Sequence, residues 1–127
     1  ETVSIIPAFH FLQNKLTYIF QKTVDNKWDL LYKWSCSIGK PETPTIKGTF
    51  YISGRKPYFG SDSYRVKYAT RIKGGYYYHS VLFNPQGTEI INDTLGEAIT
   101  HGCIRLAVDN AHWIYTNILD TTTVVIN

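Results

Sequence analysis

The sequence has little of what builds disulfide scaffolds, zinc sites or membrane spans. It contains two cysteines and no methionine among 127 residues. Two cysteines allow at most one bridge, which excludes the disulfide-dense scaffolds of small secreted domains. No C-x-x-C or H-E-x-x-H spacing occurs, so the common zinc signatures are missing. No apolar run approaches about 18 residues, the length of a spanning helix. We therefore expect no metal, no cofactor and no membrane span within this chain.

The charge is also too small and too dispersed to indicate a nucleic-acid partner. Lys and Arg number 13 against 10 Asp and Glu, which gives a net charge of +3. A nucleic-acid footprint requires basic residues clustered on one face, and here they are scattered along the chain. The sequence starts at Glu1 and shows no signal-peptide pattern. We interpret residues 1–127 as one domain excised from a longer protein whose flanks carried the targeting information.

Aromatic residues are abundant, and their distribution favours a β-rich fold. Tyr, Phe and Trp make up 15% of the chain, and such residues are enriched in strands. Short apolar or alternating runs, separated by turn residues, predict strands. These expected strands begin at Val3 and cover residues 15–21, 28–37, 48–52, 64–73, 76–83 and 122–126. We expect residues 39–48 to form a loop, and residues 53–63 to form a loop or an irregular hairpin.

One segment near the C-terminus has helical periodicity. Its apolar residues recur at i, i+3, i+4 and i+7, from Ala111 to Ile118, and Asp109 is the expected N-cap. The fold class predicted from the residues is mainly β: a sandwich or barrel of mostly antiparallel strands with one helix of about three turns.

The segment Thr100 to Leu106 carries the strongest chemical signal. Cys103 could be an inert buried side chain, as free cysteines often are. Its neighbours favour a reactive thiol instead, because Gly102 permits a tight turn and two adjacent amides can then point at one oxygen. Arg105 follows two residues later, and an arginine is rarely part of a solvent-free hydrophobic core.

A nucleophilic cysteine needs a base, and His79 is the candidate. An adjacent imidazole can take the thiol proton and leave a thiolate–imidazolium pair. A third group usually orients such a base, and a backbone carbonyl could do so here. Taken alone, His79 could equally be a hydrogen-bonded core histidine. A zinc site formed by His79, His101 and Cys103 is a remote alternative.

His79, a spacer and Thr100-His101-Gly102-Cys103-Ile104-Arg105 together resemble the signature of L,D-transpeptidase (YkuD-type) catalytic domains. That signature is a His, a spacer, then Ser/Thr-His-Gly-Cys, a hydrophobic residue and Asn or Arg. Residues 37–40, 43–45 and 48–50 resemble the Ser-x-Gly and Thr-Pro-Thr-x-Gly-x-Phe region of the same family. The resemblance covers roughly residues 15–126.

The resemblance implies an L,D-transpeptidase-like β-sandwich and a cell-wall activity. Such enzymes attack the stem tetrapeptide of peptidoglycan with a cysteine, release the terminal D-Ala and form a 3→3 cross-link to a neighbouring stem. By this resemblance Cys103 is the nucleophile and His79 the base, oriented by the Ser80 carbonyl. The amides of Gly102 and Cys103 bind the oxyanion, and His101 shapes that turn.

The resemblance also predicts the substrate contacts, partners and location. By the resemblance, Arg105 contacts substrate or braces the loop. From the residues themselves we also expect Tyr77, Tyr68 and Thr100 to contact substrate, and core packing is the equal alternative for the two tyrosines. The implied partners are donor and acceptor stem peptides, with carbapenem-type β-lactams as inhibitors. The implied location is the cell wall of a bacterium, outside the cytoplasm.

Two departures and three alternatives accompany this hypothesis. Residues 80–99 form a longer spacer than the family pattern suggests, and Arg105 stands where many members have Asn. An L,D-carboxypeptidase or endopeptidase would pass the same acyl-enzyme to water, and a wall-binding module would need no catalytic pair. Cys36 reads as a structural side chain within a strand and not as a disulfide partner of Cys103.

Overall fold

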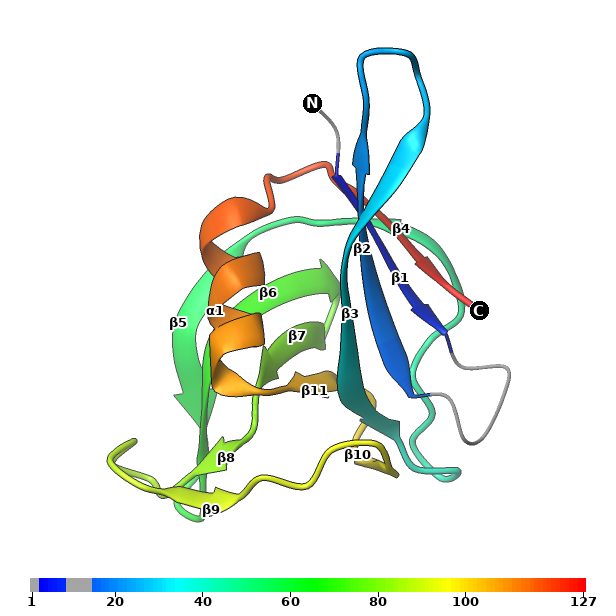
Figure 1. The fold of residues 1–127 in the computed structure, drawn as a ribbon. Helices are drawn as coiled ribbons and strands as arrows, with labels where there is room; N and C mark the ends of the chain where they lie inside the picture. Colours follow the sequence, from blue (N-terminus) through cyan, green and yellow to red (C-terminus); the bar gives the residue numbers. More distant parts are fainter. Residues whose placement is uncertain (1–2, 9–14) are drawn as a thin grey trace.

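The computed structural model describes residues 3–8 and 15–127, which form strands joined by short connections and one helix (Figure 1). The elements, in chain order, are β1 (Val3–Ala8), β2 (Leu16–Lys22), β3 (Trp28–Gly39), β4 (Gly48–Tyr51), β5 (Arg55–Gly60), β6 (Arg65–Lys73), β7 (Tyr76–Ser80), β8 (Leu82–Phe83), β9 (Ile90–Asn92), β10 (Ala98–Thr100), β11 (Ile104–Leu106), α1 (Val108–Asn117) and β12 (Thr123–Ile126). Residues 9–11, at the end of the first expected strand, lie outside the described residues.

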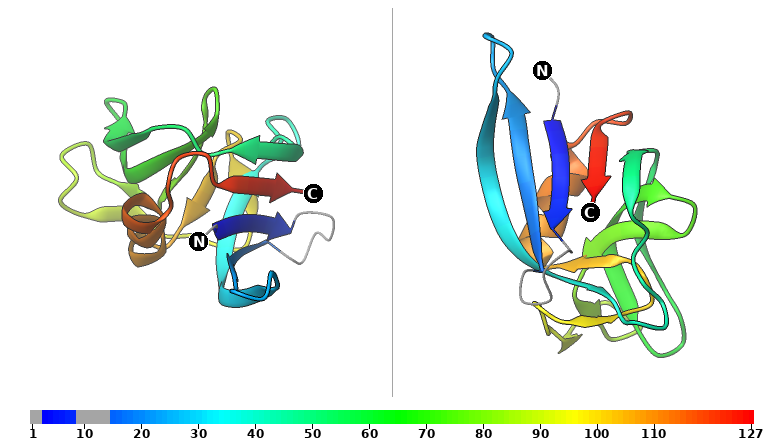
Figure 2. Two further views of the ribbon diagram at one scale, coloured as in Figure 1. Left: turned by 90° about the horizontal axis from the view of Figure 1, so that it is seen from above. Right: turned by 90° about the vertical axis from the view of Figure 1, so that its right-hand side faces the viewer.

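The strands form two halves of a sheet that share β3. One half has the order β4-β12-β1-β2-β3, and the other continues β3-β11-β7-β6-β8-β9, with β10 added beside β3 and β5 beside β6. β3 is long enough to pair with β2 through Ser35 and then with β11 at Cys36 and Ser37. Figure 2 shows the two halves from above and from the side. Pairing is antiparallel except at β1–β12, β3–β10 and β7–β11, which confirms the predicted mainly β, mostly antiparallel fold.

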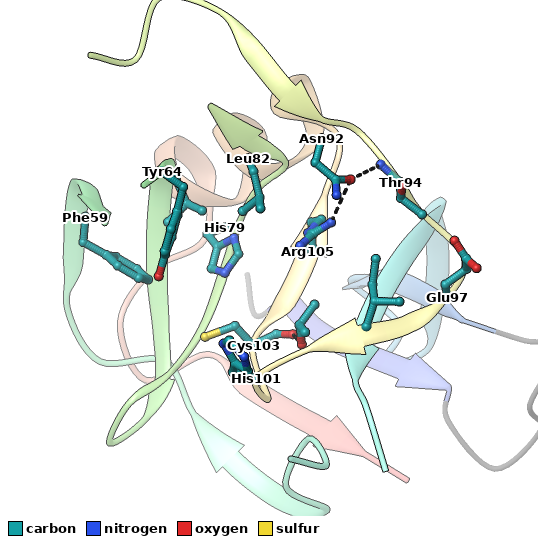
Figure 3. A pocket seen from close by; sticks show the side chains of 13 residues that line it. Phe59, Tyr64, His79, Leu82, Asn92, Thr94, Glu97, His101, Cys103 and Arg105 are labelled. Carbon is teal, nitrogen blue, oxygen red and sulfur yellow. Dashed lines mark hydrogen bonds between the residues drawn. The ribbon is translucent and has the colours of Figure 1, made fainter. Parts of the chain in front are cut away.

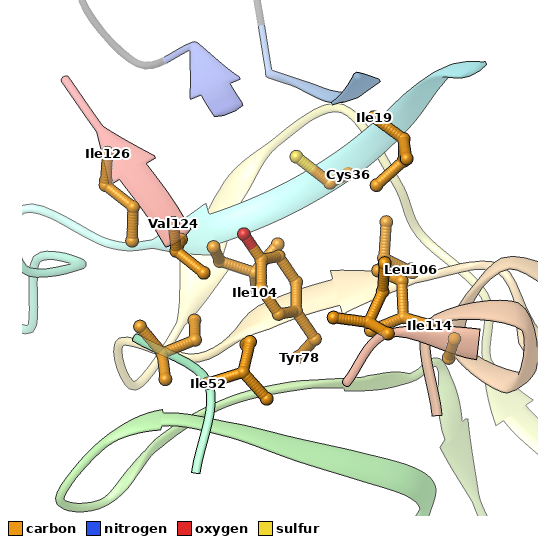
Figure 4. Close-up of a cluster of buried hydrophobic side chains, with 12 residues drawn as sticks. Ile19, Cys36, Ile52, Tyr78, Ile104, Leu106, Ile114, Val124 and Ile126 are labelled. Atoms are coloured by element: carbon orange, nitrogen blue, oxygen red, sulfur yellow. The ribbon is translucent and has the colours of Figure 1, made fainter. Parts of the chain in front are cut away.

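The hydrophobic core lies between the two halves and α1 (Figure 4). Strands β2, β3 and β12 contribute from one half, and β6, β7 and β11 from the other. Tyr78 is fully buried in this core, and so is Cys36. Both cysteines are free thiols. The prediction that Cys36 is a structural side chain and not a disulfide partner is therefore confirmed.

α1 covers part of this core and confirms the predicted helix of about three turns. Ala111 and Ile114 are its buried residues. The expected N-cap was wrong: the helix begins at Val108, and Ala107 is the capping position without a side-chain bond. Asp109 instead lies in the first turn, where a carboxylate interacts favourably with the helix dipole. No helix within the described residues is long and apolar enough to cross a membrane.

Two expected segments differ in detail from the structure. Residues 53–63 contain β5, an edge strand that pairs with β6 and tolerates Pro57 because an edge strand does not need every N–H. The expected strand 76–83 is interrupted at Val81. At this break the Ser80 hydroxyl accepts a hydrogen bond from the Lys67 N–H at 2.9 Å and donates to the Val81 carbonyl. The Ser80 side chain thus takes the place of a backbone partner in the hydrogen bonding of the sheet at this point.

Candidate active site

A cavity of about 510 Å³ opens on one face of the parallel pair β7–β11. The pair is in register at His79 and Arg105, and alternation along each strand places Tyr78 and Leu106 on the opposite face, in the core. Cys103 lies two residues before Arg105, directly before β11 (Figure 3). The residues that line the cavity are Phe59, Tyr64, Val66, His79, Leu82, Asn92, Thr94, Glu97, Ile99, Thr100, His101, Cys103 and Arg105.

His79 has the environment of a neutral base. Its side chain is 6% exposed, and its Nδ1 lies 2.7 Å from the Ser80 carbonyl oxygen. A carbonyl can only accept, so Nδ1 carries the proton and Nε2 of the neutral ring has a free lone pair. Burial lowers the pKa of His79 to about 4, with a further lowering from the Arg105 charge and an opposing effect of the Ser80 hydrogen bond. The imidazole is therefore unprotonated at neutral pH.

The Cys103 thiol is also neutral at rest. Burial raises its pKa above the usual 9.0, and a hydrogen bond from the Tyr77 backbone offsets this only in part. The sulfur lies 3.5 Å from the Gly75 carbonyl oxygen, to which the S–H donates. The thiolate–imidazolium pair considered from the sequence is thus not the resting state. A nucleophilic role for this sulfur would require removal of its proton during the attack.

The turn from Thr100 to Cys103 is closed by one hydroxyl. Thr100 Oγ1 accepts a hydrogen bond from the Gly102 N–H at 3.1 Å and donates to the Cys103 carbonyl at 2.6 Å. Gly102 has a φ of 122°, and a Cβ there would lie 2.7 Å from the Tyr76 ring, so only glycine fits. The expectation that the Gly102 amide binds an oxyanion is not supported, because that N–H already has a partner.

Arg105 lies in the cavity wall beside His79. It is 5% exposed, its Nη1 donates to Asn92 Oδ1 at 3.3 Å, and its Nε has no partner. The sequence left open whether this side chain contacts substrate or braces the loop. The facing wall comes from the spacer 80–99, which supplies Asn92, Thr94 and Glu97. Sequence reasoning flagged the length of this spacer but not these residues, because no motif marks them.

The two predicted substrate tyrosines lie elsewhere. Tyr68 adopts a φ of 56°, and its ring packs 4.7 Å from His112 and 5.6 Å from Tyr115 of α1. Tyr68 therefore does not line this cavity, and its contact with substrate stays a prediction. Tyr77 does not line the cavity either. Its ring packs 5.4 Å from Phe59, which does line the cavity and meets the His79 ring edge-on at 5.7 Å.

His101 borders two cavities. Besides the cavity with Cys103, it lines a second one of about 600 Å³ formed by residues 42–47 and Tyr76. His101, the residue before the Gly102–Cys103 turn, is therefore shared by the two cavities. Within the described residues, no group of three or more His, Cys, Asp or Glu side chains could hold a metal ion. His79, His101 and Cys103 accordingly do not form such a group.

Comparison with known proteins identifies the family. The family model of the YkuD, or L,D-transpeptidase, catalytic domain matches residues 12–126. YciB of Bacillus subtilis, which is named among the L,D-transpeptidases, is 36% identical over 76% of this chain and 55% of its own length. L,D-transpeptidase 1 of Mycobacterium tuberculosis is 30% identical over 73% of this chain and 41% of its own. The chain thus spans about half the length of these curated relatives.

Solved structures agree with this assignment. A Clostridium acetobutylicum protein, described as a fused Zn-dependent amidase/peptidase/peptidoglycan-binding domain-containing protein, has a TM-score of 0.79 and 36% identity. It aligns with 99% of this chain and 52% of its own. An L,D-transpeptidase of Mycobacterium smegmatis has a TM-score of 0.73 and 26% identity over 99% of this chain and 58% of its own. On sequence and fold together, this chain belongs to the family of YkuD-type L,D-transpeptidase catalytic domains.

Proposed function

We propose that this domain is a cysteine-dependent L,D-transpeptidase that acts on peptidoglycan stem tetrapeptides. The observation that carries the proposal is the pairing of a nucleophile and a base in one cavity. Cys103 and His79 line the same space, and the His79 ring is held by the Ser80 carbonyl with Nε2 free to accept a proton. His79 is the general base and Cys103 the nucleophile.

The reaction proceeds in two acyl transfers. His79 Nε2 takes the thiol proton while the sulfur attacks the carbonyl of the third residue. The C–N bond to the terminal D-Ala then breaks, and His79 returns the proton to the departing amine. An acceptor amine attacks the thioester, loses a proton to His79 and releases the Cys103 thiol with formation of the 3→3 cross-link.

The burial of His79 suits the second of these proton transfers, the return of the proton to the leaving amine. An imidazolium whose pKa is lowered to about 4 is a strong acid. It therefore gives its proton readily to the leaving amine, which accelerates breakdown of the tetrahedral intermediate. The neutral ring remains the dominant form at neutral pH, so the base is available for every turnover.

The second cavity favours an amine acceptor over water. It shares His101 with the cavity that contains Cys103, where we place the donor stem peptide. A bound acceptor chain in that space would place its amine at the thioester and exclude competing water. Hydrolysis by an L,D-carboxypeptidase or endopeptidase would need no second cavity.

Carbapenem-type β-lactams are the proposed inhibitors. One structural neighbour, LdtMt1, with 21% identity and a TM-score of 0.73, was solved in complex with imipenem. On this chain the Cys103 sulfur would attack the lactam carbonyl, the ring C–N bond would break and the nitrogen would take the proton. The adduct therefore adds the whole drug mass. We also propose that the domain works outside the cytoplasm, in a bacterial cell wall, as part of a longer protein.

The test is incubation with defined disaccharide-tetrapeptides, with products identified by mass spectrometry. Cys103→Ala should abolish turnover, and His79→Ala should lower it about 10²- to 10⁴-fold, the usual contribution of a positioned base. His101→Ala should cost less, and His112→Ala, an exposed histidine on α1, is the matched control. A dimer formed only with Cys103 supports transfer, and free tripeptide alone indicates the hydrolytic alternative. Turnover by Cys103→Ala would refute the mechanism.

A further inference from the structure

Arg105 is a buried cation without a counter-ion. Its side chain is 95% removed from solvent, since only 5% is exposed. The ion pairs found within residues 3–8 and 15–127 are Lys27–Asp25 and Arg55–Asp120, and neither involves Arg105. Burying an unpaired charge costs several kcal/mol in general, so such groups normally carry a partner.

Its hydrogen-bonding capacity is also mostly unused. A guanidinium has five N–H donors, whereas Arg105 makes one bond of 3.3 Å, to the amide oxygen of Asn92. Asn92 Oδ1 is shared with the Thr94 N–H, at 3.0 Å. Arg105 Nε is buried with no partner at all. Arg105 therefore lines the cavity that contains Cys103 with most of its N–H donors unpaired.

Glu97 lines the same cavity but does not neutralise Arg105. It is exposed and forms no ion pair with Arg105 within 4.0 Å. Its backbone is instead bound to β3, through Ile38 and Ser37. His79 is the partner of Arg105 across β7–β11, and its neutral imidazole supplies no negative charge.

We propose that Arg105, positioned by Asn92, binds a carboxylate of the donor stem peptide inside this cavity. The proposal rests on the proposed function and adds the residue and the chemical class that it recognises. A planar guanidinium with free N–H groups on one edge matches a carboxylate in a two-bond contact. The carboxylate belongs either to the departing terminal residue or to an internal residue of the stem.

Binding there would also act on the base. The Arg105 charge contributes to the lowered pKa of His79. A bound carboxylate cancels that charge, so the part of the lowering of the His79 pKa that comes from Arg105 should be lost, while the larger part, from burial, remains. The site would therefore strengthen the base on the substrate that it recognises.

The experiment compares carboxylate and amide forms of the donor peptide. Three peptides are used with the wild type: the free acid, the C-terminal amide, and an amide at the internal carboxylate. We expect one of the two amides to lower kcat/KM about 10- to 100-fold, the usual effect of a hydrogen bond to a charged group. Which amide has the effect identifies the carboxylate. Equal kcat/KM values for all three peptides would overturn the proposal.

Variants of Arg105 then test whether this residue causes the difference in kcat/KM between the peptides. Arg105→Met should make the acid and the sensitive amide equivalent substrates, and Arg105→Lys, which keeps the charge but not the planar donor edge, should retain part of the difference. Arg71→Met is the matched control, because that exposed arginine bonds to the Ser53 carbonyl outside the cavity. If Arg105→Met lowers activity by one factor for every peptide, its role is structural and the proposal is wrong.

Thermal unfolding of each variant separates misfolding from lost recognition. Should Arg105→Met fail to fold, the Lys variant and the wild-type peptide series still decide the question. Absence of Cys103-dependent product from every peptide would instead count against the proposed function as a whole.

Discussion

The reactivity of Cys103 towards an alkylating agent should rise steadily with pH. The thiol pKa is raised above 9.0 by burial, so the thiolate fraction at pH 7 is below about 1%. Iodoacetamide reacts with the thiolate, and the rate should therefore increase about tenfold per pH unit from pH 6 to 9. A pre-formed thiolate–imidazolium pair would give a flat profile over that range and a rate at pH 7 about 100-fold higher.

The assay is alkylation between pH 5 and 10, followed by intact mass. Cys36 should remain unmodified in the folded protein, because it is fully buried and burial raises its pKa to about 12. Cys103→Ala should accordingly take up no label until the protein is unfolded. His79→Gln should leave the slope unchanged, since His79 holds no proton to stabilise a thiolate at neutral pH. A plateau from pH 5 to 8 that disappears in His79→Gln would refute the neutral resting pair.

Three further predictions concern stability and the turn that precedes Cys103. The pKa of His79 is about 4 when folded and 6.5 when exposed. As the pH drops, the unfolded state therefore binds the proton first, and the free energy of unfolding should fall by about 3 kcal/mol between pH 6.5 and 4. Urea unfolding should show this fall for the wild type and not for His79→Gln. Thr100→Val should cost about 1–3 kcal/mol and much of the turnover by removing both bonds of the turn, whereas Thr100→Ser should keep both properties. Gly102→Ala should lower thermal stability and activity together, because its Cβ would meet the Tyr76 ring and its φ of 122° is strained for alanine.

The sequence was sufficient to predict the elements whose signals are local. The β-branched and aromatic runs indicated the strands, and the spacing from Ala111 to Ile118 predicted α1. The helix start was missed because a backbone bond from the Ala111 N–H to the Ala107 carbonyl starts the helix without a side-chain cap. The motif around Cys103 and the distant His79 predicted two residues of the site that the fold brings to one cavity.

Features that depend on tertiary geometry could not be predicted in this way. Tyr68 shares a strand with cavity-lining Val66, and simple alternation would place both side chains on one face. A positive φ at Tyr68 turns its ring onto α1 instead. The hydrogen bond from the Gly102 N–H to the Thr100 hydroxyl could not be predicted either. The sequence does not distinguish a threonine hydroxyl that closes a turn from one that contacts substrate.

Because β7 and β11 pair in parallel, we expect the length of the spacer to alter the cavity wall but not the positions of His79 and Cys103. Parallel neighbours require a crossover, and residues 80–99 form most of it. The register at His79 and Arg105 is fixed by core residues on the other faces of the two strands, Tyr78 and Leu106 among them. Extra residues in the crossover therefore enlarge the wall that carries Asn92 without moving His79 relative to β11. Variation in spacer length should accordingly alter substrate preference, whereas variation in the core beneath β7 and β11 should disturb catalysis itself.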